Sequence, residues 1–497
     1  MNKLKILIAA SEIVPFAKSG GLADVVGALP KALRALGHDV RVVMPRYYVV
    51  DKDKYALKPL EGALGVPMGI MGEEWACVYE GELPDSDVPV YFVDHEGFFG
   101  RKGLYGENGS SFIDNDNRFI FFSRAVMQLA KKLHFHPDVI HANDWHTAII
   151  PLMLNTHYAY DPDFAYTGSL LSIHNLQHQG RFYKGAMSVL DVGWEHFNKD
   201  ELEEYGGINF LKAGIVHADA ISTVSRKYAE EIRTWEFGWG LEGLINAYSY
   251  KLSGILNGVD YNEWNPTSDP HIANAYDFND LSGKEVCKSA LQQTFNLPMR
   301  SDVPVIGFVG RLVEQKGIGL IHSAIWRLMH MDIQIVLLGM GEKWAEAFFS
   351  DIAARYPDKF ACYIGYREDM AHQIEAGSDM FLMPSLFEPC GLNQIYSLAY
   401  GTIPIVRATG GLDDTIENYS SEYRSGTGFK FYDATPDALV GTVKWAVDTW
   451  CHDKAGFDQL RCNGMQQRFD WEVAAKGYVA LYHAIIKGRH SHRHQER

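Results

Sequence analysis

Several features that would assign this chain to a class of proteins are scarce. Only six cysteines occur in 497 residues, and none forms a CxxC pair, so neither a disulfide scaffold nor a cysteine zinc site is predicted. No apolar run reaches the ~18 residues that a membrane-spanning helix needs. The N-terminal apolar run is too short for a signal peptide and is expected to form the first strand. A reducing cytoplasm is therefore the expected compartment.

Positive charge is scarce as well. Lys and Arg number 46 against 62 Asp and Glu, which gives a formal net charge of −16. Such a surface disfavours non-specific binding to nucleic acid and to anionic membranes, so neither is an expected partner. A phosphate ligand would have to be bound by a few basic residues concentrated in one cleft.

Short apolar runs alternate with helical stretches, which is the βαβ pattern of a parallel sheet. The predicted strands are 4–10, 39–44, 89–93, 138–141, 170–173 and 219–224 in the first half, and 304–309, 334–338, 361–364, 379–383 and 403–406 in the second. After 304–309, the apolar residues from Ile321 to Met329 have the spacing of one buried helix face. The predicted fold class is α/β, with two Rossmann-like domains facing an interdomain cleft at the carboxyl ends of their strands.

An irregular stretch divides the two halves. It begins with an Asn257-Gly258 turn signal and continues through prolines at 266 and 270. The predicted domains are 1–253 and 254–471. A helical pattern follows at 472–488, and the basic, His-bearing residues 489–497 are expected to be disordered.

The stretch 387–396, FEPCGLNQIY, stands where a buried strand would lead into a helix. A helix starting at Gly391-Leu392 would present unpaired N–H groups to a diphosphate. Glu388, just before it, can accept hydrogen bonds from a sugar hydroxyl. For an isolated Glu-Pro, the favoured alternative is a carboxylate that caps the helix.

Two other loops have the residue types that bind phosphate. Lys18-Ser19-Gly20-Gly21 lies between a predicted strand and a predicted helix, where glycines allow a close backbone approach. Arg311 and Lys316 lie five residues apart after another strand and could clamp two phosphates without a metal. Taken singly, each loop could equally be an ordinary strand-to-helix turn or a solvated surface loop.

Three Asp-x-Asp triplets imitate a metal signature, at 51–53, 114–116 and 161–163. Each lies in a polar loop, where solvated surface charge is the favoured reading. No metal and no other cofactor is therefore expected.

Eight motifs carry a resemblance to a known family: KSGGLADV (18–25), NDWH (143–146), IHN (173–175), NGVD (257–260), GRL (310–312), QKG (315–317), FEPCGL (387–392) and TGGL (409–412). In this order they resemble the motif set of bacterial glycogen synthases and plant starch synthases, across nearly the whole chain. The resemblance implies a GT-B glycosyltransferase whose final helix crosses back to the first domain. It also implies transfer of glucose from ADP-glucose to the non-reducing end of an α-1,4-glucan, with retention of configuration.

The resemblance assigns roles to individual residues. Arg311 and Lys316 would hold the diphosphate, with Lys18 and the backbone of Gly20 and Gly21 reaching it from the other domain. Charge develops on the departing diphosphate oxygen, so fixed cations there lower the barrier.

Further residues would contact the donor sugar and base. Glu388 and His174 would contact the glucose, Asp144 and Asp24 match acidic positions near the reacting sugar, and the ring of Tyr366 would lie against adenine. For His174 the alternative is a packed imidazole. The remaining donor-binding positions are Asn257, Cys390, Gly391, Leu392, Thr409, Gly410 and Gly411.

For the acceptor, the aromatic, glycine-flanked segment 235–240 could stack on sugar rings, with Trp239 and His146 as candidates; local packing is the even alternative for this segment. Two departures from wider patterns occur: Ser19 stands where the family usually has Thr, and Tyr396 stands where many other GT-B enzymes have a second Glu. Tyr396 matches the bacterial synthases. UDP-glucose as donor, another acceptor, or an inactive glucan-binding homologue remain alternatives.

Overall fold

The structure, a computed structural model, describes residues 3–107 and 109–495. The chain forms two compact units. Unit 1 contains the residues up to 224, 229–258 and those from 471 on, and unit 2 contains 225–228 and 259–470. The predicted division after residue 253 falls inside the strand β15 (Leu252–Gly254), which pairs with the sheet of unit 1. The chain therefore leaves unit 1 five residues later than expected.

Unit 1 is built on one large sheet in the order β15-β14-β10-β9-β1-β2-β6-β5-β3. Its strands are β1 (Lys5–Ala9), β2 (Asp39–Pro45), β3 (Lys58–Pro59), β5 (Glu73–Glu82), β6 (Pro89–Asp94), β9 (Val139–Asn143), β10 (Gly168–Ile173), β14 (Ala220–Thr223) and β15, and β4 (Leu64–Pro67) pairs with β5. Pairing is parallel from β15 to β6 and antiparallel beyond. All six predicted strands of this half are present, whereas the antiparallel edge was not predicted.

The helices of unit 1 are α1 (Gly21–Ala35), α2 (Glu96–Phe99), α3 (Asn115–Lys132), α4 (Ile150–Asn155), α5 (Met187–Leu190), α6 (Phe210–His217), α8 (Glu242–Ala247) and α17 (Trp471–Gln495), and α7 (Arg226–Glu231) begins within the short segment that belongs to unit 2. Two small sheets complete the unit: β7 (Gly106–Glu107) with β8 (Ser110–Ser111), and β11 (Arg181–Tyr183), β13 (Gly207–Asn209) and β12 (Glu203–Glu204).

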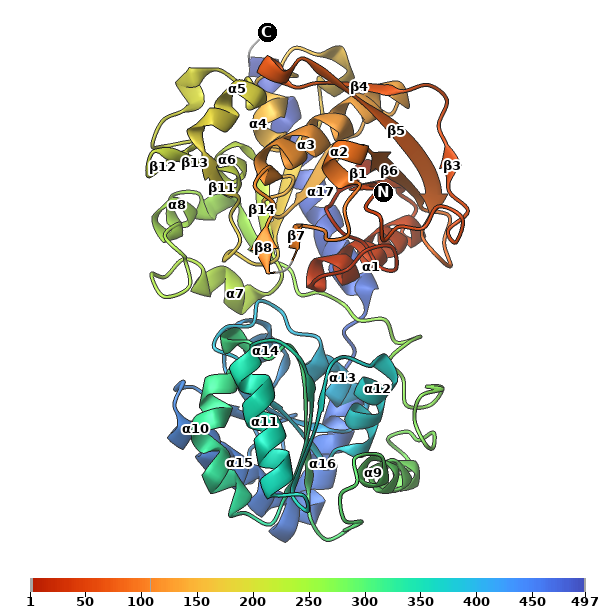
Figure 1. Ribbon diagram of the computed structural model, residues 1–497, viewed down its shortest axis with the longest axis vertical. Coiled ribbons are helices and arrows are strands. Elements are labelled where there is room, and N and C mark those ends of the chain that lie inside the picture. Colours follow the sequence, from red (N-terminus) through yellow and green to blue (C-terminus); the bar gives the residue numbers. More distant parts are fainter. Residues whose placement is uncertain (1–2, 108, 496–497) are drawn as a thin grey trace. The chain divides into compact units, whose positions relative to one another are not determined.

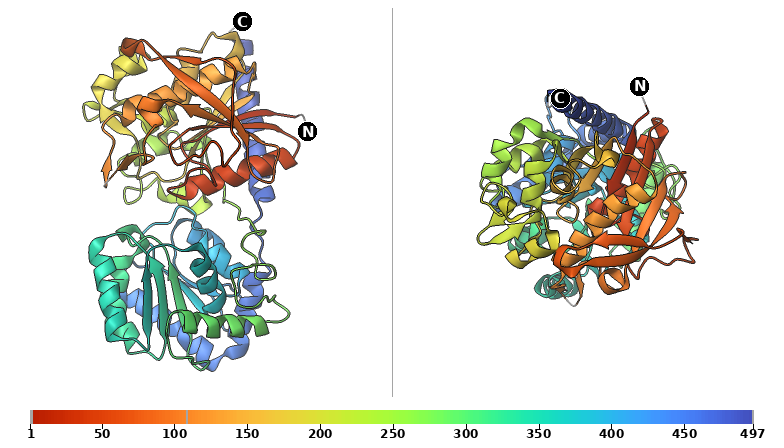
Figure 2. Two further views of the ribbon diagram at one scale, coloured as in Figure 1. Left: turned by 45° about the vertical axis from the view of Figure 1, so that its right-hand side comes forward. Right: turned by 90° about the horizontal axis from the view of Figure 1, so that it is seen from above.

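The last helix, α17, returns to unit 1 and packs against α1, β9 and β10, as Figures 1 and 2 show. Tyr482 is buried, and its hydroxyl lies 2.9 Å from Nδ1 of His141 on β9. A Cβ on Gly168 would lie 2.1 Å from the side chain of Ile485, so the strand admits the helix only with glycine there. The expected disorder from residue 489 is wrong up to Gln495, because Arg489 continues the helix and pairs with Asp219 at 2.8 Å. Residues 496–497 lie outside the described part.

Unit 2 has a six-stranded, fully parallel sheet in the order β18-β17-β16-β19-β20-β21. The strands are β16 (Val305–Val309), β17 (Gln334–Gly339), β18 (Phe360–Ile364), β19 (Met380–Met383), β20 (Ile403–Arg407) and β21 (Phe429–Phe431). The helices are α9 (Ser282–Thr294), α10 (Ile318–Met329), α11 (Lys343–Arg355), α12 (Glu368–Gly377), α13 (Asn393–Ala399), α14 (Gly410–Thr415), α15 (Pro436–His452) and α16 (Lys454–Met465).

Helices cover both faces of this sheet (Figure 1), and each face has its own apolar cluster. Along β17, Ile335 and Leu337 join one cluster while Val336 and Leu338 join the other. A strand buried on both faces is apolar throughout, which is why these strands could be recognised as short apolar runs. The predicted face of α10, from Ile321 to Met329, is confirmed as part of the first cluster.

Both sheets contain a topological switch point, where the strand order reverses. In unit 2 it lies between β16 and β19, and in unit 1 between β1 and β9. The loops that leave such a pair run to opposite faces of the sheet, so a crevice opens beyond the carboxyl ends of the strands. The motif loops after β16, β19, β1 and β9 therefore begin where ligands bind in open α/β sheets.

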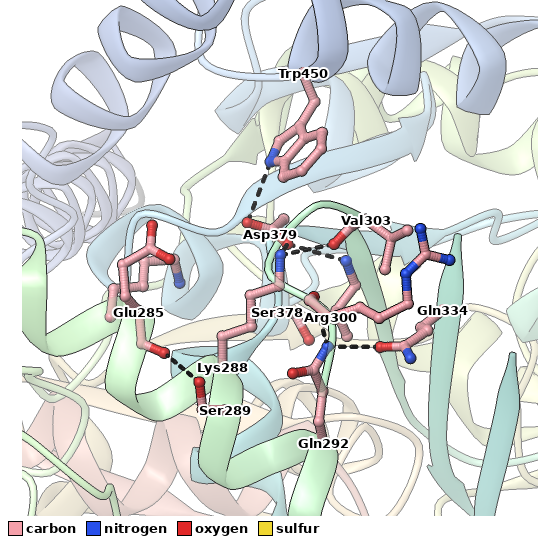
Figure 3. A network of polar contacts seen from close by, with 12 residues as sticks. Glu285, Lys288, Ser289, Gln292, Arg300, Val303, Gln334, Ser378, Asp379 and Trp450 are labelled. Atoms are coloured by element: carbon pink, nitrogen blue, oxygen red, sulfur yellow. Dashed lines mark hydrogen bonds and ion pairs between the residues drawn. The ribbon is translucent and has the colours of Figure 1, made fainter. Parts of the chain in front are cut away.

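A buried ion cluster in unit 2 is centred on Asp379, directly before β19, and joins it to α9 and α16. Figure 3 shows Asp379 with Lys288 of α9. The Asp379 carboxylate lies 2.8 Å from Nζ of Lys288 and 2.8 Å from a guanidinium nitrogen of Arg461. It also accepts the N–H of Val305 at 2.9 Å. Burial would raise the pKa of Asp379, but the charges of Lys288 and Arg461 outweigh it and lower the pKa.

We expect Asp379→Asn to lower the free energy of unfolding of unit 2 by about 3–5 kcal/mol, because it leaves two buried cations without their counterion. Denaturant unfolding with CD detection measures this. The matched control is Asp358→Asn, at an exposed aspartate, which should change stability by less than about 0.5 kcal/mol. Equal stabilities of the two variants would contradict the assignment.

Candidate active site

The switch point of unit 2 brings together two motifs that lie 72 residues apart. Nζ of Lys316, in the loop after β16, lies 2.6 Å from Oε2 of Glu388, in the loop after β19. The same oxygen accepts the hydroxyl of Ser385 at 2.9 Å. Glu388 is only 6% exposed, so its carboxylate depends on these two partners. The prediction that Lys316 and Glu388 share one crevice of this unit is thus consistent with their observed contact.

A third loop packs tightly on this pair. The N–H of Gly411 donates to the carbonyl of Glu388 at 3.0 Å. A Cβ at Gly410 would lie 1.9 Å from the Glu388 carbonyl oxygen, and one at Gly411 would lie 1.9 Å from that of Cys390. The two glycines are therefore needed for the loops to meet, a role that sequence reasoning did not assign. Thr409, which precedes them, is fully buried.

The helix that follows Glu388 starts slightly later than predicted. Leu392 is its N-cap and Asn393 its first residue. Gly391 has φ +72°, which favours glycine, and the side chain of Asn393 donates to the carbonyl of Val309 at the end of β16 at 2.8 Å. The turn 388–392 is therefore tied to both strands of the switch point.

Two other residues assigned to the nucleotide lie at the same edge of the sheet. Arg311 is exposed and its guanidinium lies 3.4 Å from Oε1 of Gln315. Tyr366 follows β18 and is 62% exposed. Their roles remain predictions, with side chains accessible to a ligand.

In unit 1, Asp144 and His174 form a buried polar site beyond β9 and β10. Oδ1 of Asp144 accepts the N–H of His174 at 2.7 Å, and Asp144 itself has φ +53°. Burial raises the pKa of Asp144 to about 7, although the N–H groups of His174 and Asn175 oppose the shift.

Burial favours the neutral form of the His174 ring. Asn143 donates its Nδ2 to the carbonyl of Ala9 at 3.1 Å, so its Oδ1 is the acceptor for Nε2 of His174 at 2.9 Å. Nε2 therefore carries the proton, and burial lowers the pKa of His174 to about 3. A neutral imidazole at this place can serve a hydroxyl group but supplies no charge to a phosphate.

Glu12, which sequence reasoning missed, organises the glycine loop after β1. Its buried carboxylate accepts the N–H and the hydroxyl of Ser19 and, at 3.3 Å, the N–H of Gly20. The Gly20 N–H, predicted to bind the diphosphate, is therefore occupied by an internal carboxylate. Burial raises the pKa of Glu12. An isolated Glu three residues after a strand offers no pattern by which to find it.

Lys18 and Asp24, both predicted at the donor site, form an ion pair with each other at 2.7 Å. The pair bridges the glycine loop and the first turn of α1. Lys18 is 54% exposed by its side chain, so its ammonium can exchange this partner for a ligand. Gly21, the first residue of α1, has open space where a Cβ would stand.

The two acceptor candidates, Trp239 and His146, and the donor candidate Asn257 differ in how exposed they are. Trp235 is 82% exposed and Trp239 is 38% exposed, and the Trp239 carbonyl accepts from Gln179 at 3.1 Å. His146 is only 6% exposed and is stacked on Tyr105 at 4.5 Å. Asn257 is also buried, and among the described residues its Oδ1 has no hydrogen-bond partner.

The three Asp-x-Asp triplets have local structural roles. Asp51 accepts the N–H groups two and three residues on at 2.9 and 3.0 Å. Asp114 pairs with Arg101 at 2.6 Å, and Asp161 pairs with Lys131 at 2.6 Å. These contacts account for the first aspartate of each triplet without a metal.

Two Rossmann-like units, each with polar motif loops at its switch point, and a last helix that returns to unit 1 define the GT-B class of glycosyltransferases. Comparison with known proteins agrees. Residues 5–247 match the family model of the starch synthase catalytic domain, and 291–455 match glycosyl transferases group 1.

The similarity to individual proteins extends over nearly the whole chain. The chain is 56% identical to glycogen synthase 1 of Geobacter metallireducens, covering 98% of this chain and 97% of that protein, and 55% identical to glycogen synthase 1 of Geobacter sulfurreducens, covering 98% of each. Among solved structures, the catalytic domain of starch synthase IV from Arabidopsis thaliana, bound to ADP and acarbose, superimposes with a TM-score of 0.90. It is 32% identical and covers 98% of this chain and 100% of that one. The chain belongs to the bacterial glycogen synthase and plant starch synthase family and is a glucosyltransferase.

Within the described residues, no helix is both long enough and apolar enough to cross a membrane.

We expect Gly411→Ala to lower kcat/KM on the order of 100-fold, because its Cβ would displace the turn that carries Glu388, and small misplacements in a site cost about that much. Initial rates of sugar transfer measure this. Gly441→Ala is the control, since a Cβ there meets nothing within 4 Å. Equal rates in both variants would show that the turn tolerates displacement.

Proposed function

We propose that the protein is a glycogen synthase that transfers glucose from ADP-glucose to the non-reducing end of an α-1,4-glucan, with retention of configuration. The Lys316–Glu388 pair at the switch point of unit 2 is the observation that carries this proposal. It places a cation beside a buried carboxylate, the two groups that a diphosphate and a sugar hydroxyl require. The family and the Arabidopsis starch synthase, solved with ADP and acarbose, support the choice of donor and acceptor.

The basic residues of the loop after β16 stabilise the leaving group. As the glycosidic bond to the diphosphate breaks, negative charge develops on the departing oxygen, and Arg311 and Lys316 would neutralise it. Glu388, which also accepts the hydroxyl of Ser385, holds Lys316 in place before the substrate arrives. The ammonium therefore needs little reorganisation during the reaction, which is the condition for efficient electrostatic stabilisation.

The remaining groups bind the other parts of the donor and the acceptor. Glu388 accepts hydrogen bonds from sugar hydroxyls. The neutral ring of His174 binds a further hydroxyl, and Asp144 positions this residue by accepting its backbone N–H. Tyr366 stacks on the base of the nucleotide, and Lys18 meets the diphosphate after leaving Asp24. For the acceptor, Trp239 and the more exposed Trp235 offer ring surfaces on which glucan can stack. His146 is buried, so it can support the residues around it but has little surface for contact with glucan.

Six free cysteines fit a reducing compartment, and we place the reaction in the cytoplasm.

We expect Arg311→Ala and Lys316→Ala each to lower kcat by about 10²- to 10³-fold, the effect of removing one preorganised group that stabilises developing charge. Steady-state kinetics with saturating glycogen measure it. Arg311→Ala should keep its melting temperature, whereas Lys316→Ala should lower it, because the buried Glu388 loses its cationic partner. Lys343→Ala, which removes a lysine whose side chain is 89% exposed, is the matched control. Wild-type rates in either active-site variant would refute the clamp.

Catalysis by these cations does not need a metal. Treatment with EDTA followed by gel filtration should leave kcat for glucose transfer unchanged within about twofold, since two fixed side-chain cations take the place that Mg²⁺ has elsewhere. Strict dependence on an added divalent ion would contradict the proposed leaving-group chemistry.

The donor is tested by incubating the protein with glycogen and either ADP-glucose or UDP-glucose. We expect release of nucleoside diphosphate and incorporation of glucose into the polymer at least tenfold faster with ADP-glucose. A preference for UDP-glucose would replace the donor but keep the reaction. Absence of incorporation with both would favour another acceptor or a glucan-binding homologue without activity.

A further inference from the structure

A second cluster of ligand groups lies in unit 2, on α12 and on the segment that leads into the unit. Glu368 and His372 stand four residues apart on α12, and Glu263 comes from the irregular stretch before α9. One ligand atom of each residue lies within 4.8 Å of those of the other two. None of the three belongs to the motifs assigned to the transfer reaction.

His372 is a buried histidine with only one of its two ring nitrogens hydrogen-bonded among the described residues. Its side chain is 1% exposed, and its Nδ1 lies 2.7 Å from Oδ2 of Asp269. Its other nitrogen, Nε2, is buried and has no hydrogen-bond partner among the described residues. An unpaired buried polar atom costs free energy, so a missing partner is indicated.

The surroundings fix this orientation of the ring. Asp269 also accepts the hydroxyl of Tyr400. The carboxylate therefore keeps the His372 proton on Nδ1 and leaves Nε2 as a lone-pair donor. Histidines that bind metals are typically held by a carboxylate in this manner.

Stacking holds the ring in its plane. Trp264 lies against His372 with ring centroids 3.7 Å apart, and against Tyr396 at 3.9 Å. Because Trp264 directly follows Glu263, the same stack positions the backbone that presents that carboxylate. The histidine and one of its glutamates are thus held by one rigid group.

Glu263 and Glu368 are two like charges at one place. Among the described residues, no Lys or Arg forms an ion pair with Glu263 or Glu368. The carboxylates of Glu263 and Glu368 present oxygens within 4.8 Å of each other, so their like charges repel. A shared proton or a cation can relieve the repulsion between them, and a cation would also supply a partner for Nε2 of His372.

We propose that Glu263, Glu368 and His372 bind one divalent transition-metal ion that ties the entry segment of unit 2 to α12. One imidazole and two carboxylates, with open positions towards solvent, suit Zn²⁺ and similar ions better than Mg²⁺, which keeps its waters and prefers oxygen ligands. The ion has a structural role, which is compatible with transfer chemistry that does not need a metal.

Another cluster, His196, Glu201 and His217 in unit 1, has the same ligand types. Among the described residues, however, it has no buried histidine nitrogen without a hydrogen-bond partner. Its Glu201 already accepts from His196 at 2.6 Å and from His217 at 2.9 Å. In a zinc titration it must nevertheless be accounted for, as must the histidines near the C-terminus.

The test is a titration of the metal-stripped full-length protein with ZnCl₂, followed by isothermal titration calorimetry and by melting temperature. The variant is Glu263→Gln with Glu368→Gln, which preserves shape at two exposed positions. The matched control is Glu285→Gln with Glu422→Gln, two exposed glutamates of the same unit. All other histidines remain in every protein, so their zinc binding cancels in the comparison.

We expect the wild type and the control to bind one more equivalent of zinc than the Glu263/Glu368 variant, or to bind it at least tenfold more tightly. Zinc should also raise their melting temperature by more than it raises that of the variant. Identical binding isotherms and identical thermal shifts in all three proteins would show that the carboxylates share only a proton, and would overturn the proposal.

Discussion

The ion pair between Lys316 and Glu388 is the interaction on which the candidate site depends. A carboxylate that is 6% exposed is costly unless it is paired, and here its partner comes from the loop of the neighbouring strand. The pair therefore holds together two loops that leave the sheet in opposite directions at the switch point. Gly410 and Gly411 then bring a third loop within hydrogen-bond distance of the Glu388 backbone.

The two units supply different chemistry. In unit 2 the loop after β16 contributes permanent cations, which suit a diphosphate. In unit 1 burial lowers the pKa of His174 to about 3 and raises the pKa of Asp144 to about 7, so that its groups suit hydroxyls. Glu12 reinforces this difference because it occupies N–H groups of the glycine loop. Each unit thus presents a different kind of ligand group beyond its own strands.

Buried polar contacts also hold the framework that carries the site. Asp379 fixes α9 and α16 to the start of β19, the strand that leads to Glu388. Asp269, Tyr400 and the stack of Trp264 do the same for the irregular stretch before α9. That stretch is polar in sequence, yet its Trp264 and Asp269 are buried. The entry into unit 2 is thus a packed part of the domain rather than a linker.

The sequence by itself determined the parallel sheets, because strands buried on both faces are apolar throughout, and it determined the motif loops, because glycines and cations follow those strands at characteristic positions. Strand β5 escaped prediction, since one of its faces is solvated and its residues are mostly polar. The end of the chain was misjudged because its composition is polar, whereas Arg489 gains Asp219 as a partner only when the helix docks.

Only the tertiary structure decided which groups meet. The pairing of Lys316 with Glu388 and that of His372 with Asp269 each join residues from distant parts of the sequence. Local spacing cannot specify such contacts, because they depend on how the strands and helices pack. Burial, which sets the protonation of Asp144 and His174, is likewise a property of the folded chain.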